Sequence, residues 1–275
     1  MISAKLILAS TYEGGKPIYS VQTSMPKWML AELNTHRVFS RSSGSSRAIP
    51  LDAIIRRVQA FPYIPYHWGK AQGGMQANEE LVGAVKDKAL EEWLRLRDQA
   101  VETARAFEQL GLHKQVANRI LEPWMYIDTI ITSTEWNNFF ELRDHPDAQP
   151  EMQALAKAIR KVIDEAVPQE LDYNEWHLPY VGRGELLMDG IESALMYSTA
   201  RCARVSYHLH DGTVANPVAD IKLYQKLVGS RPLHASPAEH QALYSKDYPR
   251  VLGYQRNFVG WVQHRALLEN KAHAT

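Results

Sequence analysis

The chain has few of the features that assign a protein to a class by composition alone. Its 275 residues include one cysteine, Cys202, so no disulfide can form within the chain. No apolar run approaches the ~20 residues of a membrane span, and residues 1–10 lack the basic flank and long apolar core of a signal peptide. A protein that binds nucleic acid or a membrane surface usually has an excess of basic residues. This chain has none, because it contains 31 basic and 31 acidic side chains. We therefore expect a cytoplasmic protein whose main partner is neither a membrane nor a nucleic acid.

Local patterns predict a helix-rich fold around a modest sheet. Residues 3–9 and 17–23 have the pattern of two strands joined by a Gly14-Gly15 turn, and residues 125–132 that of a further strand. The spacing of apolar residues and capping signals predicts helices over residues 26–37, 51–60, 78–110, 148–167, 191–206, 218–228 and 257–268, with others from a capping box at 132–135 through 142 and from Ser236. The sequence thus predicts one domain, residues 1–275, of the α/β (α+β) class, with a central, mostly antiparallel sheet flanked by long helices.

The densest group of polar side chains lies in residues 35–47. Three arginines, one histidine and five serines surround Gly44 there, with almost no apolar residue. A packed core does not accept unpaired guanidinium groups, whereas arginines and hydroxyl donors together hold phosphate oxygens well. The apolar spacing before this segment puts His36 and Arg37 in the last turn of a helix, followed by a loop in which Gly44 is free to take a positive φ. A solvated serine-rich loop is the alternative, and the composition leaves both open.

The same segment carries a family resemblance. Residues 36–47 read His-Arg-x-x-Ser-x-x-x-x-Ser-x-Arg, which resembles the signature of the flavin-dependent thymidylate synthases, the thymidylate synthase-complementing proteins, at unbroken spacing. A second block, residues 119–123 followed by 136–143 and 147–151, is similar to the central region of that family. A third block, residues 203–240, resembles the segment with which the family usually begins, although here it lies near the carboxyl end. The order of the segments therefore resembles a circular permutation, which close and exposed termini allow.

The resemblance implies an activity and a set of site residues. The activity is transfer of a one-carbon unit from methylenetetrahydrofolate to C5 of dUMP, with FAD as cofactor and NADPH as reductant, in a homotetramer whose subunits share active sites. Arg143 is implied to be the catalytic group, because its guanidinium would stabilise negative charge on the pyrimidine carbonyl oxygens. The nucleotide phosphate is assigned to Ser45, Arg47 and Arg119, and the flavin to His36, Arg37, Ser42, Ser43, Asn138 and His240, with Ser206 as a weaker candidate.

The single cysteine bears on the mechanism. Another route to C5 methylation adds a cysteine thiolate to C6 of the base. Cys202 lies inside a predicted helix, and we expect it to be a buried core residue rather than a nucleophile. His36, His234 and His240 do not have the spacing of metal ligands, so no metal is expected. We therefore expect charge, rather than a thiol, to activate the pyrimidine.

Several positions depart from the family pattern. Thr35 stands in place of the first signature arginine, Ser42 and Ser43 in place of an asparagine and a glutamate, and Glu32 in place of a glutamine. A carboxylate in place of an amide changes which hydrogen-bond donors and acceptors of a base are matched. Two alternatives to dUMP methylation therefore stay open: a folate-dependent methylase or hydroxymethylase of another pyrimidine deoxynucleotide, and a non-catalytic nucleotide-binding homologue.

Overall fold

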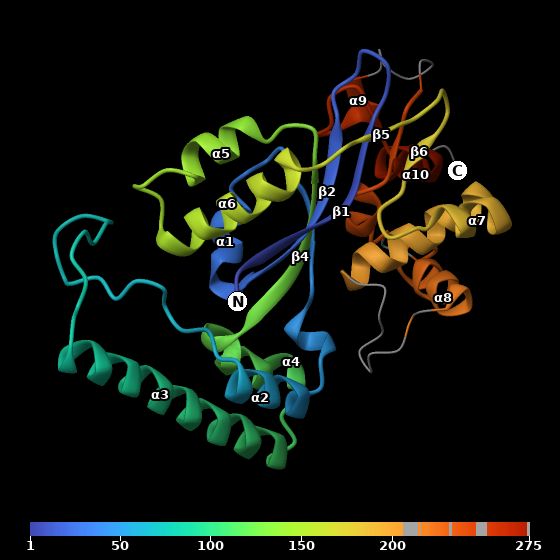
Figure 1. Ribbon diagram of the computed structural model, residues 1–275. Coiled ribbons are helices and arrows are strands. Elements are labelled where there is room, and N and C mark those ends of the chain that lie inside the picture. The colour runs from blue at the N-terminus through green and yellow to red at the C-terminus, as the bar shows by residue number, and fades with distance from the viewer. Residues whose placement is uncertain (206–213, 215, 231–232, 246–251, 274–275) are drawn as a thin grey trace.

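The computed structural model describes residues 1–205, 214, 216–230, 233–245 and 252–273. At its centre lies a five-stranded sheet of order β3-β4-β2-β1-β5 (Figure 1). The β1–β2, β2–β4 and β3–β4 pairs are antiparallel and only the short β5 pairs in parallel, with β1. The predicted α+β class with a mostly antiparallel sheet is confirmed. The strands are β1 (Ser3–Thr11), β2 (Ile18–Pro26), β3 (Ser40–Ser43), β4 (Tyr126–Ser133) and β5 (Gln169–Glu170).

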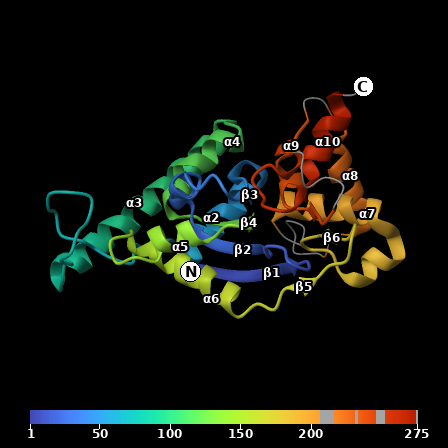
Figure 2. The same cartoon turned by 90° about the horizontal axis from the view of Figure 1, so that it is seen from above.

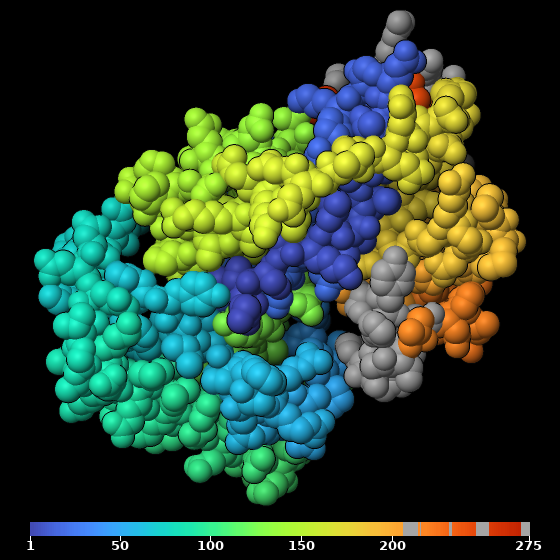
Figure 3. Space-filling view, in the orientation of Figure 1, coloured from blue at the N-terminus to red at the C-terminus, as the bar shows by residue number. Residues whose placement is uncertain are grey.

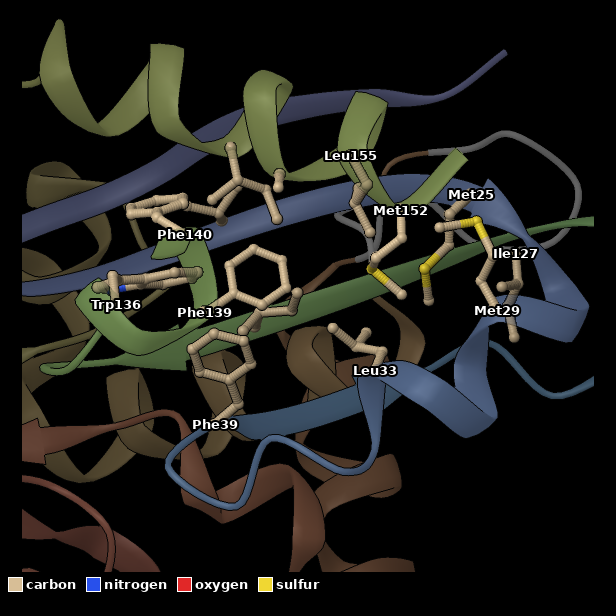
Figure 4. Close-up of a cluster of buried hydrophobic side chains, with 14 residues drawn as sticks. Met25, Met29, Leu33, Phe39, Ile127, Trp136, Phe139, Phe140, Met152 and Leu155 are labelled. Atoms are coloured by element: carbon tan, nitrogen blue, oxygen red, sulfur yellow. The ribbon is translucent and has the colours of Figure 1, made fainter. Parts of the chain in front are cut away.

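One face of this sheet packs on α5 (Asn137–Arg143) and α6 (Pro150–Asp164), with the short helix α1 (Leu30–Leu33) beside them (Figure 1). Side chains alternate along a strand, so the odd-numbered Val21 and Met25 of β2 and Ile127 and Ile131 of β4 point to this face. They meet an aromatic and thioether cluster from the helices, in which Figure 4 labels Trp136, Phe139, Phe140, Met152 and Leu155. This face is the main apolar core.

The opposite face is covered by the C-terminal part of the chain (Figure 1). Here lie α7 (Arg183–Arg204), which is kinked at Gly190, and α8 (Pro217–Val228), together with a three-stranded antiparallel sheet of order β6-β7-β8. That small sheet consists of β6 (Trp176–His177), β7 (Ala242–Leu243) and β8 (Val262–Gln263). The 3-10 helix η4 (Ser236–Glu239) and the helices α9 (Leu252–Gln255) and α10 (His264–His273) complete this layer.

A third group of helices packs beyond the end of the sheet. It comprises η2 (Ser46–Ala48), α2 (Leu51–Ala60), α3 (Ala84–Gln109), α4 (Lys114–Ala117) and η3 (Asn118–Trp124). α2 buries positions 51, 54, 55 and 58 against Val101 and Ala104 of α3, which is the i, i+3, i+4, i+7 pattern of one helix face. Seen from above, α3 extends away from the sheet on the side opposite to α7 and α8, and the space-filling view shows it at one edge of the molecule (Figures 2 and 3). No helix within the described ranges is both long and apolar enough to cross a membrane.

Several sequence predictions of local structure are corrected here. The helix predicted over residues 26–37 is a 3-10 turn, η1 (Lys27–Met29), followed by α1, so His36 and Arg37 lie beyond the helix end. The serine run is not a loop, because Ser40–Ser43 pairs with β4 as an edge strand, and Gly44 does not have a positive φ. The capping box predicted at residues 132–135 is wrong, since Thr132 and Ser133 complete β4 and no side chain caps α5. α3 begins at Ala84 rather than at Asn78, after Gly83 with φ +58°.

Candidate active site

Four predicted site residues come together around one pocket of about 330 Å³. His36 and Arg37 follow α1, and Asn138 and Arg143 lie at the two ends of α5. The segment that carries His36 is fixed by Phe39, which is buried against Trp136 and Phe139 with ring centroids 4.7 and 5.2 Å apart. The apolar core therefore places an imidazole, two guanidinium groups and a carboxamide at the rim of one cavity.

Arg143 is held by two partners. Its Nε donates a hydrogen bond to Nε2 of His36 at 3.1 Å, and its Nη1 lies 2.5 Å from Oε1 of Glu32. His36 is largely buried, with its ring perpendicular to that of Phe139 at 5.0 Å. Burial and the nearby charges of Arg143 and Arg41 lower the pKa of His36 to about 4. His36 is therefore neutral near pH 7, so Nε2 can accept the bond from Arg143 while Nδ1 carries the proton.

The residues assigned to the phosphate form a second group. Arg47 is exposed on η2 and Ser45 is exposed directly before it, and the Ser46 hydroxyl donates to Oε1 of Glu122 at 2.8 Å. Arg119 donates to the same carboxylate oxygen at 3.3 Å. A larger pocket of about 840 Å³ adjoins this group and is lined by Lys27, Trp28, Tyr63, Trp93, Arg119 and Glu122, among others. Within one chain, the pocket of Arg143 and the surface of Arg119 and η2 are thus two separate sites.

The remaining predicted residues have partners inside the fold. The Ser43 hydroxyl is hydrogen-bonded to that of Thr129 at 2.8 Å. Ser42 lies 3.0 Å from Nε2 of His240, and Nδ1 of His240 lies 2.9 Å from the Thr132 hydroxyl. His240 is fully buried at the end of η4, not in the first turn of a helix as the sequence predicts. Ser206 lies outside the described residues. The flavin roles of these residues stay predictions, and a flavin contact by His240 would require one of its hydrogen bonds to open.

The hydrogen bonds of His240 continue across four strands of the sheet. From Thr132 they pass to Ser20 at 2.6 Å, then to Nε2 of His177 at 2.8 Å, and from Nδ1 of His177 to Ser10 at 2.9 Å. We call this set the polar chain; it consists of Ser10, Ser20, Ser42, Thr132, His177 and His240, all buried. Burial lowers the pKa of both histidines to about 3, so both are neutral acceptors or donors within the network. The sequence analysis did not identify His177, Ser10 and Ser20 as members of a buried polar network. The even-numbered positions of β2 are polar (Ser20, Gln22, Ser24), and this alternation could have indicated that one face of the sheet is polar.

Cys202 is fully buried on α7, as the sequence predicts. Burial raises the pKa of its thiol far above the ordinary value, and Nε2 of Gln241 lies 3.6 Å from its sulfur. A thiolate nucleophile at this position has no support in the geometry. Within the described residues, no group of three or more potential metal ligands occurs.

The pocket of Arg143 has polar groups of the kind that could hold part of a flavin dinucleotide. Arg37 and Asn138 are exposed at its rim and can meet phosphate or ring oxygens, but its volume is at the lower limit of small-molecule pockets. Ser42, Ser43 and His240 face other protein groups rather than this pocket. The whole cofactor therefore needs more surface than this pocket provides.

The α+β fold carries a pocket whose paired guanidinium and imidazole groups can donate hydrogen bonds to a ligand. A family model described as thymidylate synthase complementing protein matches residues 16–169, more than half of the chain. The chain belongs to this family, which confirms the resemblance of the first two blocks. The third block lies outside the matched residues, so the permuted order stays a prediction.

Comparison with solved structures finds distant matches. Two crystal structures of the UMP/dUMP methylase PolB from Streptomyces cacaoi, bound with 5-Br dUMP and 5-Br UMP, match with TM-scores of 0.48 and 0.47. Their identities to this chain are 13% and 18%, and each match covers 60% of this chain and 91% or 90% of the other. Flavin-dependent thymidylate synthase ThyX from Helicobacter pylori, complexed with FAD and dUMP, matches with a TM-score of 0.38 and 20% identity, over 53% of this chain and 67% of that one. No curated protein matches the sequence.

Proposed function

We propose that this protein transfers a one-carbon unit to C5 of a pyrimidine nucleotide, with dUMP as the first candidate. The observation that carries the proposal is the Arg143–His36 pair at a pocket rim in a chain of the thymidylate synthase complementing family. Arg143 would contact a carbonyl oxygen of the base and stabilise the negative charge that develops there when C5 becomes nucleophilic. His36, neutral and fixed by the core, orients that guanidinium. No protein thiol is required.

The cofactor and co-substrates are part of the same proposal. FAD, when bound, would carry the one-carbon unit from methylenetetrahydrofolate to the pyrimidine. NADPH would supply the reducing equivalents. His36, Arg37 and Asn138 would hold part of the flavin at the Arg143 pocket. Ser45, Arg47 and Arg119 would hold the nucleotide phosphate by charge-assisted hydrogen bonds, each contributing about 1.5–3 kcal/mol.

The two separate groups of site residues bear on the assembly. Arg143, proposed to meet the base, and Arg119, proposed to meet the phosphate, line different pockets of one chain. We therefore propose a homotetramer in which one subunit supplies Arg143 and a neighbour supplies Arg47 and Arg119. Mixing Arg143→Ala subunits with Arg119→Ala subunits should then restore part of the activity that each variant lacks alone. Two inactive variants that stay inactive when mixed would place each site within one chain.

The activity itself is tested by product analysis. The purified protein is incubated with dUMP, methylenetetrahydrofolate, NADPH and FAD, and the nucleotide product is identified by mass spectrometry, which separates methyl from hydroxymethyl. We expect dTMP, and we expect Arg143→Lys to lower kcat by about ten- to hundredfold, because lysine keeps the charge but loses the planar donor set. Arg95→Lys, on the exposed face of α3, is the matched control. Absence of product from dUMP, UMP and their cytosine counterparts would rule the proposal out.

A further inference from the structure

Glu32 does not line the Arg143 pocket, yet it is bound to the residue that does. Glu32 lies on α1, one helical turn before His36 in the sequence. Its carboxylate forms an ion pair with Nη1 of Arg143. His36 occupies Nε of the same guanidinium. Nε is therefore hydrogen-bonded and Nη1 is in an ion pair, and Nη2 is left without a hydrogen-bond partner among the described residues.

We propose that Glu32 is a positioning residue that makes Arg143 select a neutral carbonyl group over an anion. The proposal depends on the proposed function in one respect: that function identifies the carbonyl group as one of a pyrimidine base. The observation behind the proposal is the contact of Arg143 with two other side chains: the carboxylate of Glu32 and the imidazole of His36.

The first step of the reasoning concerns geometry. Phosphate and carboxylate groups bind arginine best as a fork, through two parallel N–H bonds on one edge of the guanidinium. One edge of Arg143 has its Nε donor occupied by His36, and at the other edge the carboxylate of Glu32 lies 2.5 Å from Nη1, so a forked anion there would meet its negative charge. A single carbonyl oxygen needs only one donor, and Nη2 provides it.

The second step concerns charge. The carboxylate of Glu32 compensates the positive charge of Arg143 at 2.5 Å, and both side chains are about three-quarters buried, with 29% and 23% of each exposed. Partial burial weakens solvent screening, so the negative charge of Glu32 also repels an incoming anion. Arg37, at the same pocket, is exposed and has no ion pair among the described residues. The pocket thus has one compensated cation, Arg143, which suits a neutral ring, and one cation without an ion pair in the described part of the chain, Arg37, which stays available to an anionic group of the flavin.

The test compares two probes in full-length protein. Inorganic phosphate represents the anion and deoxyuridine, which has no phosphate, represents the neutral base; binding is followed by the ring ¹⁵N signals of His36, assigned with His36→Gln. The variants are Glu32→Gln, which keeps the shape and an acceptor but removes the charge, and Glu32→Ala, which removes both. Glu92→Gln is the matched control, because Glu92 pairs with Arg95 on the exposed side of α3.

In the wild type and in Glu92→Gln we expect deoxyuridine to shift the His36 signals, and phosphate to do so only weakly, through Arg37. In both Glu32 variants the affinity for phosphate at this pocket should rise by about tenfold, because the carboxylate that repels the anion is gone. Unchanged phosphate binding in both Glu32 variants, with the fold intact by circular dichroism, would overturn the proposal.

The phosphate arm is independent of the enzymatic activity. If the wild type neither binds deoxyuridine nor forms a methylated nucleotide, the proposed function fails, while a gain of phosphate affinity in the Glu32 variants still supports the positioning role. If methylation is found and the phosphate gain is not, the positioning role alone fails.

Discussion

The two faces of the central sheet are stabilised by different physical means. The face toward α5 and α6 is a close-packed cluster of aromatic, aliphatic and thioether side chains (Figure 4). The face toward the C-terminal elements is crossed by the polar chain, in which hydroxyls of four adjacent strands alternate with two imidazoles from β6 and the end of η4. Dispersion and the hydrophobic effect are non-directional, whereas each hydrogen bond fixes a distance and an angle. The apolar face therefore supplies most of the stability, and the polar face fixes how the C-terminal part is docked.

The largest expected effect lies on the apolar face. Phe139→Ala removes a fully buried ring from the middle of the cluster, and we expect a loss of about 3–5 kcal/mol in the free energy of unfolding, measured by urea denaturation. Because the Phe139 ring also packs edge-on against His36, binding at the Arg143 pocket should weaken as well. Leu187→Ala, at an exposed position, is the control and should change stability little. A loss below about 1 kcal/mol for Phe139→Ala would mean that this face is not the principal core.

The pH dependence of stability is a second test and acts mainly on the polar face. His177 and His240 have pKa values of about 3 in the fold, against about 6.5 when unfolded, so the unfolded chain binds more protons at acidic pH. Their contribution is complete above about pH 6.5 and is lost as the pH falls from there toward 3. At pH 5.5 each should cost about 1.4 kcal/mol relative to pH 8, or about 3 kcal/mol for the pair. His36, with a pKa of about 4, should add a similar loss.

Chemical denaturation at several pH values measures this slope. In His177→Gln, which keeps hydrogen-bonding atoms but does not titrate, the slope between pH 6 and 5 should fall by about one third, since one of three buried histidines is gone. An identical slope in the variant and the wild type would show that His177 protonates as freely in the fold as in the unfolded chain.

A matched pair of near-isosteric substitutions sharpens the comparison. Thr132→Val removes the central hydroxyl of the polar chain and leaves Ser20 and His240 each without one partner. Val21→Thr places a hydroxyl in the apolar cluster, where the described neighbours are hydrocarbon and aromatic groups. Both changes keep the volume, and both should cost about 1–3 kcal/mol, because each leaves a buried polar group unsatisfied. Urea denaturation measures both; if Thr132→Val alone were neutral or stabilising, the polar chain would have no role in stability.

Local signals in the sequence were sufficient for elements whose pattern is carried by neighbouring residues. The β1–β2 hairpin with Gly14 at positive φ, and the helices α2 and α8, agree with the prediction to within a few residues, because turn chemistry and apolar spacing act over short distances. β3 was missed because a serine run has little intrinsic strand preference, and the strand forms only through pairing with β4, nearly 90 residues later. The short α1 was overestimated because Thr35 turns back on the chain, donating its hydroxyl hydrogen to the carbonyl of Glu32.

The site shows the same division between local and distant information. The motif spacing of residues 36–47 and the helix ending at Arg143 selected candidate site residues, and the structure brings four of them to one pocket. The polar chain could not be predicted in this way. Each hydrogen bond from His177 or His240 to a strand of the central sheet joins residues more than 100 positions apart in the sequence. The Glu32–Arg143 contact was equally hidden, because α1 and α5 meet only through the shared core.

The smallest expected effect concerns Cys202, which lies on the side of the polar face. Cys202→Ala removes one buried sulfur and should cost about 1 kcal/mol, comparable to the loss of a methyl group. Cys202→Ser should be tolerated to a similar extent, because Gln241 can donate to a hydroxyl where it now meets the thiol. In product assays both variants should keep the wild-type kcat, since the raised pKa keeps this thiol protonated and nothing in the pocket of Arg143 approaches it. A loss of product formation in Cys202→Ala with the fold intact would restore a thiolate mechanism and would make the polar face, rather than the Arg143 pocket, the place where the pyrimidine is activated.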